Sequence, residues 1–302
     1  MGGRWLGATC YADDLLLLAP TRSAMQAMLK VCERYAIQHN IAFSTLEDAV
    51  KSKTKCLYIC GDMNRRDYPA NLKLNGKSLP FVTTATHLGH ELCQDGTMTL
   101  DIKIKRAKLI DKSTEIRETF SFADPVQILQ AVNIYCCDHY GSMLWDLYSE
   151  MAGQYFRCWN TCTKLVWNCP RSTHTYFVTC QLAANFVSIR TKILGTYVKF
   201  FKTLLNSKSP EVALVANIVG RDIQSTTGSN LTRLKQETGL NPWVSTSSMI
   251  KNTLTLNEAS VPEEDKWRPP LLEKLLLQRH MMENQLEETK EIQSLIDSLC
   301  ST

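Results

Sequence analysis

The first strongly patterned segment of the chain is a pair of apolar runs separated by two acids. Residues 4–12 are predicted as a strand, Asp13-Asp14 as a tight turn and residues 15–19 as the returning strand. A capping motif at 21–23 is followed, over residues 25–36, by apolar positions at intervals of three and four. The pattern predicts a β-hairpin with two carboxylates at its tip, followed by an amphipathic helix that packs against it.

Short apolar runs of strand length recur along the chain to about residue 98. Residues 41–43 and 56–60 are predicted as strands, with a polar, lysine-bearing stretch between them. Asn75-Gly76 lies between two further apolar runs and predicts a second hairpin, because these residues readily adopt the positive φ angles of a two-residue turn. We therefore expect an α+β domain over 1–98.

From about residue 99 the periodicity becomes helical. Residues 102–112 predict a helix with a strongly basic side, since isoleucines and leucines there alternate with five cations. Helices are also predicted at 126–140, 151–166, 183–205 and 271–299, with a polar, glycine-containing linker at 225–230. The expected further units are a helical domain at 99–210 and a linker with a C-terminal amphipathic helix at 211–302.

Composition narrows the class of protein only slightly. A chain of 302 residues with 44% hydrophobic and 21% charged residues is expected to fold as a globular protein. The net charge of +4 decides little about nucleic-acid binding, although an acidic tail from about residue 258 leaves the preceding body more basic. No signal-peptide pattern and no membrane-length apolar run is found. We expect an intracellular protein of the cytoplasm or nucleus, neither secreted nor bound to a membrane.

The 12 cysteines are expected to be reduced thiols. Their spacings, such as Cys136-Cys137 and Cys158-x3-Cys162, supply no two clean CxxC pairs, and the six histidines are scattered. Small buried apolar side chains are therefore favoured over a zinc site.

Adjacent carboxylates at a hairpin tip repel each other and raise each other's pKa unless a cation offsets them. A divalent metal is the natural partner for Asp13 and Asp14, because two-metal phosphoryl transfer needs hard carboxylate ligands on a rigid support. The alternative is that both are solvated turn residues, as aspartate commonly is. The apolar strands on both sides of the pair favour the metal-binding interpretation.

The string Tyr11-Ala12-Asp13-Asp14 resembles the YADD motif of reverse transcriptases, and its extension over residues 15–21 resembles the form found in non-LTR (LINE-type) retrotransposons. Residues 53–58 resemble the lysine-bearing motif of that family, and residues 87–92 its YLGH-type primer-grip motif, with His87 in place of the usual aromatic residue. Order and approximate spacing agree, and the likeness extends to about residue 205. The resemblance implies a partial polymerase palm over 1–98 and a helical thumb with its following region beyond it.

The resemblance also implies roles for individual residues. Asp13 and Asp14 are implied to be catalytic carboxylates that coordinate Mg2+, and Lys53, favoured over Lys55, to lie near an incoming deoxynucleoside triphosphate. The residues implied to contact nucleic acid are Tyr11, Ala12, Leu88 and Gly89. Partners would be an RNA template and a DNA primer. Fingers and a further aspartate strand are expected upstream of the YADD hairpin in this family, so we expect an incomplete metal site and an inactive fragment.

The basic helix supports a second hypothesis, a non-catalytic protein that binds nucleic acid. Lys105, Lys108 and Lys112 share one side of the predicted helix at intervals of three and four, where they could follow a line of phosphates. The alternative is a merely solvated face. Both interpretations are open at this point, as is a relic without function.

Overall fold

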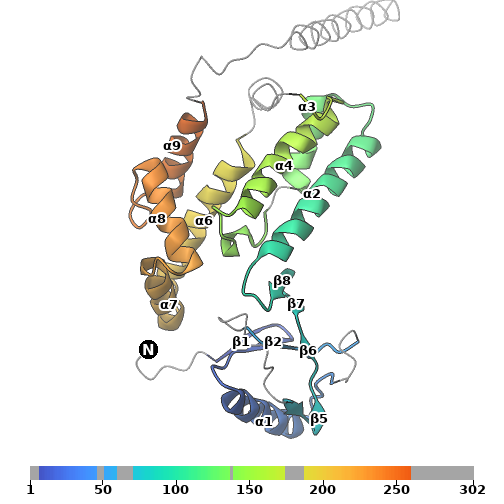
Figure 1. The fold of residues 1–302 in the computed structure, drawn as a ribbon, viewed down its shortest axis with the longest axis vertical. Coiled ribbons are helices and arrows are strands. Elements are labelled where there is room, and N and C mark those ends of the chain that lie inside the picture. The colour runs from blue at the N-terminus through green and yellow to red at the C-terminus, as the bar shows by residue number, and fades with distance from the viewer. Residues whose placement is uncertain (1–6, 46–50, 60–70, 137–138, 174–186, 260–302) are drawn as a thin grey trace, which may run out of the picture.

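The structure, a computed structural model, describes residues 7–45, 51–59, 71–136, 139–173 and 187–259. It is mostly helical with small two-stranded sheets, which agrees with the expected α+β class. Figure 1 shows an elongated molecule with helix α1 and the strands at one end and the remaining helices at the other. The hairpin of β7 and β8 lies where the two parts meet.

The predicted hairpin at the start of the chain is confirmed, with its tip moved by one residue. Strand β1 (Ala8–Tyr11) pairs antiparallel with β2 (Asp14–Leu17), and Tyr11 lies opposite Asp14. The turn therefore consists of Ala12 and Asp13, and Ala12 has a φ of 53°. A two-residue hairpin turn needs such positive φ angles to match the twist of its strands. Asp14 is consequently the first residue of the returning strand and is no turn residue.

Helix α1 (Arg22–Gln38) begins as its sequence predicts. The side chain of Thr21 accepts a hydrogen bond from the backbone N–H of Ala24 (3.2 Å), which satisfies one of the free donors of the first turn. The helix ends in a Schellman motif, in which the N–H of Ile41 donates to the carbonyl of Ala36 (2.8 Å) and Asn40 adopts a φ of 52°.

This helix end explains why the strand predicted at 41–43 is wrong. The N–H of Ile41, the first residue of the predicted strand, bonds the end of α1 and is therefore unavailable for pairing with another strand. Residues 41–43 have no regular secondary structure. The strand predicted at 56–60 is shorter than expected within the described residues. The remaining strands are β3 (Cys56–Leu57), β4 (Lys73–Leu74), β5 (Lys77–Ser78), β6 (Phe81–Val82), β7 (Thr84–His87) and β8 (His90–Cys93).

The predicted Asn75-Gly76 hairpin is confirmed. Strands β4 and β5 pair antiparallel around the turn, whose residues have φ angles of 53° and 74°. Strand β6 pairs in parallel with β3 instead of extending this hairpin. The side chain of Gln26 on α1 donates to the carbonyl of Lys73 (2.8 Å) and accepts from its N–H (2.9 Å), so helix and hairpin are joined. A small core fills this unit: Leu29, Leu72, Leu74 and Leu79, with Leu17, Met25, Phe43, Cys56 and Phe81 packed around them.

A larger core holds the helices together. The elements are α2 (Thr99–Thr119), α3 (Pro125–Tyr135), the 3-10 helix η1 (Ser142–Leu144), α4 (Glu150–Val166), α6 (Ile189–Leu205), α7 (Pro210–Arg221), α8 (Thr226–Thr238) and α9 (Ser247–Ala259). Helix α2 lies along α4, and α6 contacts α7 and α9. Trp145, Tyr197 and Phe201 are among the largest side chains that are fully buried.

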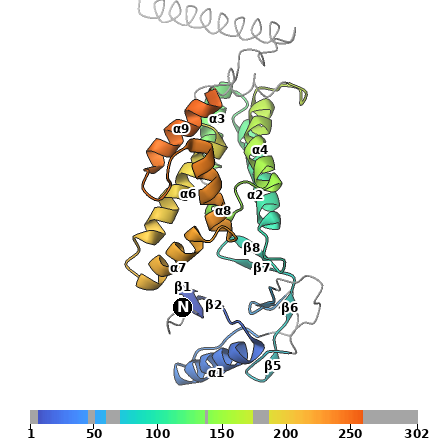
Figure 2. The same cartoon turned by 60° about the vertical axis from the view of Figure 1, so that its left-hand side comes forward.

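The linker predicted at 225–230 is wrong. Ser225 caps α8, since its side chain accepts from the N–H of Gly228 (2.9 Å). A side chain on Gly228 would come within 2.1 Å of the carbonyl oxygen of Asp222, so the glycine allows a close approach and marks no flexible segment. Beyond residue 210, Ala216 and Leu234 belong to the same hydrophobic core as residues of α6. Figure 2 shows α7, α8 and α9 beside α6.

Other predicted helices differ at their ends. The helix predicted at 126–140 ends at Tyr135, and the one predicted at 183–205 begins at Ile189 within the described residues. The helix predicted at 271–299 lies outside the described residues. Among the helices of the described residues, none combines the length and the apolar composition that a membrane span requires.

Candidate nucleic-acid interface

The two adjacent aspartates stand exposed at the tip of the first hairpin. Asp13 lies in the turn and Asp14 opens β2, beside Tyr11, whose side chain is 70% exposed. Among the described residues neither carboxylate has a hydrogen bond or ion pair. Figures 1 and 2 both place this hairpin between α1 and the helices of the larger core. Two unpaired carboxylates on adjacent residues are suitable oxygen ligands for a hard divalent cation.

The carboxylates form an incomplete ligand set. Within the described ranges no group of three or more His, Cys, Asp or Glu side chains is placed to hold a metal ion. Asp13 and Asp14 therefore fit Mg2+ as two ligands that need further ones. Lys53 is exposed in the turn before β3, where the side chain of Ser52 donates to the carbonyl of Thr54 (2.7 Å). No ion pair joins Lys53 to the aspartates in the described part of the chain, so its role near a triphosphate stays a prediction.

The segment that resembles the primer-grip motif forms a tight hairpin. Strands β7 and β8 pair with His87 opposite His90, and the turn consists of Leu88 and Gly89, with φ angles of 47° and 76°. The hydroxyl of Thr86 donates to the carboxylate of Glu91 across the strands (2.7 Å). Leu88 is partly buried and Gly89 exposed, so the turn presents mainly backbone to the surroundings.

A buried carboxylate fastens this hairpin to the helices. Asp101, 1% exposed in the first turn of α2, accepts hydrogen bonds from the N–H of Glu91 (3.2 Å) and from the indole N–H of Trp145 (2.8 Å). The ammonium of Lys105 lies 3.5 Å from its Oδ2. One side chain thus joins β8, α2 and the segment after η1. We call Asp101, Glu91, Lys105, Trp145 and His90 the Asp101 cluster.

His90 completes the cluster and is buried between the hairpin and the helices. Burial first, and then the charge of Lys105, hold the pKa of His90 below its usual value, although Asp101 opposes this. Its Nδ1 accepts from Lys105 Nζ (3.1 Å), and its ring stacks on Tyr140 with centroids 4.9 Å apart. A Cβ on Gly141 would lie 1.5 Å from the His90 ring, so only glycine fits there. The histidine is a packing residue between the hairpin and the helices.

Of the three lysines proposed to contact phosphates, Lys105, Lys108 and Lys112, only Lys105 belongs to the Asp101 cluster. Lys105 donates to the carbonyl of Tyr140 (2.6 Å), and only 17% of its side chain is exposed. Its ammonium therefore bonds groups inside the protein and is not available to a phosphate. Lys112 is exposed but pairs with Glu115 (2.6 Å). Lys108 is exposed and has no partner among the described residues. The structure therefore leaves Lys108 and Lys112 as the members of this set that a phosphate can reach.

A second polar network braces the helices around η1. Arg190 forms two hydrogen bonds with the carboxylate of Glu237 (both 2.6 Å), which also accepts from the hydroxyl of Tyr148 (3.0 Å). Burial alone would raise the pKa of Glu237, but the hydrogen bonds and charge of Arg190 outweigh it and hold this pKa below the usual range. The side chain of Asn230 bonds the backbone of Trp145 (2.9 Å) and Leu147 (3.0 Å).

Sequence reasoning did not identify these buried polar residues. One feature of the sequence could have pointed to Asp101. It is an acid four residues before Lys105 on a strongly basic helix, and this spacing favours an ion pair. Arg190, Glu237 and Asn230 had none, since the partners of their side chains described above lie 47 to 89 residues away along the chain. Comparison of the chain with protein-family models, curated proteins and solved structures found no match.

Proposed function

We propose that this chain is the carboxy-terminal part of an RNA-directed DNA polymerase, the reverse transcriptase of a non-LTR retrotransposon. The observation that carries the proposal is the hairpin β1–β2, which presents Asp13 and Asp14 of the YADD string as exposed carboxylates at its tip, with no ion pair to any residue that the structure describes. The hairpin β7–β8, at the position of the primer-grip motif, adds support. On this proposal the strands and α1 form part of a palm, and α2 with the helices after it forms a thumb and the region beyond.

In the proposed reaction, the 3'-hydroxyl of a DNA primer attacks the α-phosphate of a deoxynucleoside triphosphate opposite an RNA template. Asp13 and Asp14 would hold Mg2+, which lowers the pKa of the attacking hydroxyl and stabilises charge on the leaving oxygen. Tyr11 and Ala12, at the exposed tip, would lie beside the end of the template–primer. The backbone of Leu88 and Gly89 would support the primer strand, and Lys53 would lie near the triphosphate.

A polypeptide of residues 1–302 is expected to show no primer extension with Mg2+ or Mn2+. Two carboxylates cannot hold both ions of a two-metal site, and the described residues offer no third ligand beside them. The measurement is extension of a labelled DNA primer on an RNA template. Synthesis that is present with the parent chain and lost with Asp13→Ala would contradict the expectation that the site is incomplete.

A non-catalytic role in nucleic-acid binding is the second candidate function. The observation that favours it is the exposed Lys108 on α2, with Lys112 one turn further along the same side. Such a surface would contact the backbone of a duplex without reading its sequence, since phosphate contacts position a duplex and do not specify bases. This candidate needs no complete metal site.

Changing both Lys108 and Lys112 to Gln is expected to weaken binding to an RNA–DNA duplex. The slope of log affinity against log salt concentration should become shallower by about 0.7 to 0.9 for each phosphate that the variant no longer neutralises. Fluorescence anisotropy at several salt concentrations measures both quantities. Lys77 and Lys235, exposed on β5 and α8, provide a control pair with the same change in charge. Equal slopes for the two double variants would mean that α2 has only a solvated basic face.

A further inference from the structure

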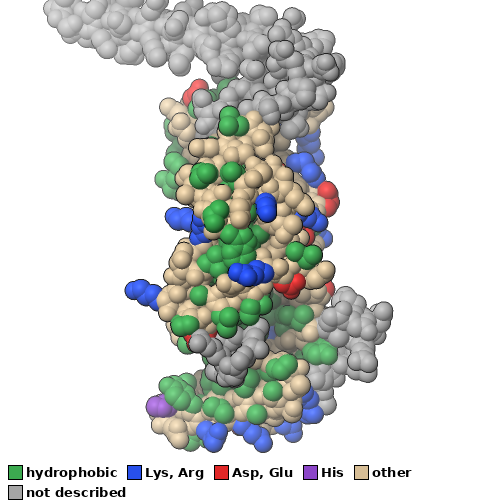
Figure 3. All heavy atoms as spheres, turned by 90° about the vertical axis from the view of Figure 1, so that its left-hand side faces the viewer, with side chains coloured by type: hydrophobic (Ala, Val, Ile, Leu, Met, Phe, Trp, Pro, Cys, Tyr) green, Lys and Arg blue, Asp and Glu red, His purple; other side chains and the backbone are tan. Residues whose placement is uncertain are grey.

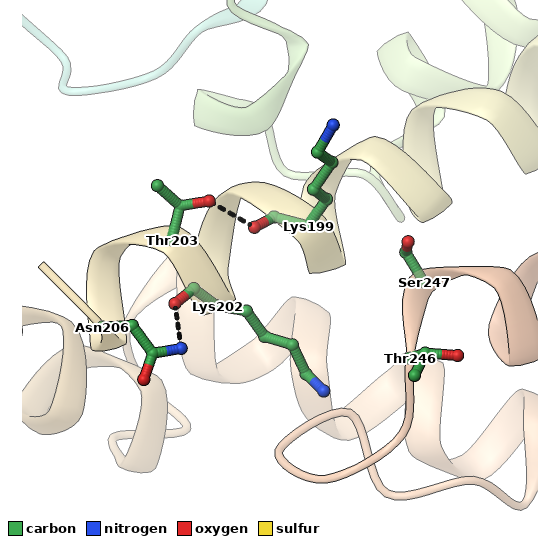
Figure 4. A pocket seen from close by; sticks show the side chains of 6 residues that line it. All are labelled: Lys199, Lys202, Thr203, Asn206, Thr246 and Ser247. Atoms are coloured by element: carbon green, nitrogen blue, oxygen red, sulfur yellow. Dashed lines mark hydrogen bonds between the residues drawn. The ribbon is translucent and has the colours of Figure 1, made fainter.

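Hydrophobic side chains are exposed on the side of the molecule where α7, α8 and α9 lie (Figure 3). A polar hollow between α6 and the start of α9 is lined by Lys199, Lys202, Thr203, Asn206, Thr246 and Ser247. Figure 4 shows that the ammonium groups of Lys199 and Lys202 point away from each other, and that the hydroxyl of Thr246 points away from both. Since these groups do not converge, they form no ligand site. The exposed apolar face of α7 has a more regular arrangement.

Helix α7 buries one side and exposes an apolar side opposite to it. It contacts α6 and α8, and its buried residues are Ala216 and Gly220. A Cβ on Gly220 would lie 2.6 Å from the ring of Phe201 on α6, so this side fits tightly against the helices. Leu214 and Ile218, 37% and 40% exposed, lie on the other side, because two positions correspond to about 200° of rotation around a helix. A helix that is apolar on opposite sides is expected to bury both.

Charged residues lie at the two ends of this exposed face. Glu211 is in the first turn of α7 and Arg221 in the last. The sequence Glu211, Leu214, Ile218 and Arg221 has spacings of three, four and three, which place the four side chains on one side of the helix, as in a heptad repeat. We call these four residues the α7 seam. It has an apolar centre, a carboxylate at one end and a guanidinium at the other.

The order of residues in the α7 seam is symmetric about Ala216. Leu214 and Ile218 are each two positions from Ala216, and Glu211 and Arg221 are each five positions from it. If two copies lie antiparallel about a two-fold axis at Ala216, Glu211 of each copy faces Arg221 of the other. Leu214 then packs against Ile218 of the second copy. A parallel pair would instead place like charges opposite each other. The antiparallel pair is self-complementary, as an isologous dimer interface must be.

Both charged groups can take part in such a pair. The guanidinium of Arg221 is exposed and lies 5.7 Å from the centroid of the Trp243 ring, and stacking of this kind leaves its N–H groups available to a carboxylate. The carboxylate of Glu211 accepts from the hydroxyl of Ser209 (2.9 Å), and an ionised carboxylate can accept several hydrogen bonds at once.

We propose that the α7 seam joins two copies of this chain in an antiparallel dimer. The face of a single short helix is smaller than a standard interface of about 1,600 Å², so the dimer is weak and forms reversibly as the protein concentration rises. The proposal is independent of the proposed polymerase function, because it uses none of the residues assigned to the metal, the triphosphate or the nucleic acid.

The test uses single charge reversals in the full chain. Glu211→Arg gives a seam with two positive ends, and Arg221→Glu gives one with two negative ends, so each variant faces its own copy with like charges. In an equal mixture of the two variants, however, every positive end can face a negative one. Glu118→Arg and Lys235→Glu, at exposed positions of α2 and α8, are controls with the same changes in charge. Circular dichroism establishes that each variant is folded, and sedimentation velocity measures association over a range of protein concentrations.

The parent should form dimers as its concentration rises. Each seam variant should associate about tenfold more weakly, since two attractive contacts become two repulsive ones, and added salt should reduce this difference. The equal mixture should regain the association of the parent, whereas the control variants should behave like the parent both alone and mixed. A parent that stays monomeric at every concentration would overturn the proposal. So would seam variants that associate like the parent, or a mixture that associates no better than its components.

Discussion

In a polymerase completed by an upstream region from a related element, Asp13→Asn should lower the rate of DNA synthesis about a thousandfold. Metal ions contribute several kcal/mol of charge stabilisation in the transition state, and each 1.36 kcal/mol is a factor of about ten in rate. Affinity for the template–primer should stay nearly unchanged, because it comes mainly from phosphate contacts away from the aspartate. Primer extension and fluorescence anisotropy measure the two quantities separately.

The matched control for this variant is Asp111→Asn. Asp111 is exposed on α2, so its replacement removes the same charge without touching the hairpin tip. It should leave both synthesis and binding as they are in the parent. Equal losses of rate and affinity in Asp13→Asn would mean that this carboxylate acts in binding, and would count against its assignment as a metal ligand.

Local signals were the part of this fold that the sequence could predict. The Asn75-Gly76 turn depends on residues that tolerate positive φ, and the start of α1 depends on the Thr21 cap. The first hairpin was predicted with Asp13-Asp14 as its turn, one residue beyond the observed turn at Ala12-Asp13. Each of these features is decided within a few residues. For the same reason the candidate aspartates could be placed at a hairpin tip before their surroundings were known.

Features decided by distant contacts were predicted poorly. The polar segment at 225–230 has the composition of a linker, but the cap at Ser225 and the close approach of Gly228 to Asp222 make it the start of a helix. The grouping of Lys105 with Lys108 was correct as helix geometry and gave no information on burial. Lys105 is enclosed by Tyr140, 35 residues further along the chain, which no periodicity reveals.

Asp101 is the residue whose loss should most affect the stability of the chain. Its carboxylate accepts from the N–H of Glu91 and from the indole of Trp145, and it offsets the ammonium of Lys105. Removing one partner of a buried ion pair costs about 3 to 5 kcal/mol, because the other charge is left without compensation. We expect Asp101→Ala to lower the free energy of unfolding by an amount in this range. Denaturant unfolding followed by circular dichroism measures it.

Three comparisons separate this effect from a general loss of charge. Asp111→Ala, on the exposed side of the same helix, should change the free energy of unfolding by no more than about 0.5 kcal/mol. Asp101→Asn should be intermediate, since an amide oxygen can serve one of the two donors from β8 and Trp145 but carries no charge for Lys105. Combining Asp101→Ala with Lys105→Met should recover part of the loss, because the uncompensated ammonium is then absent. If Asp101→Ala and Asp111→Ala destabilise the chain equally, the carboxylate does not hold the β7–β8 hairpin on the helices.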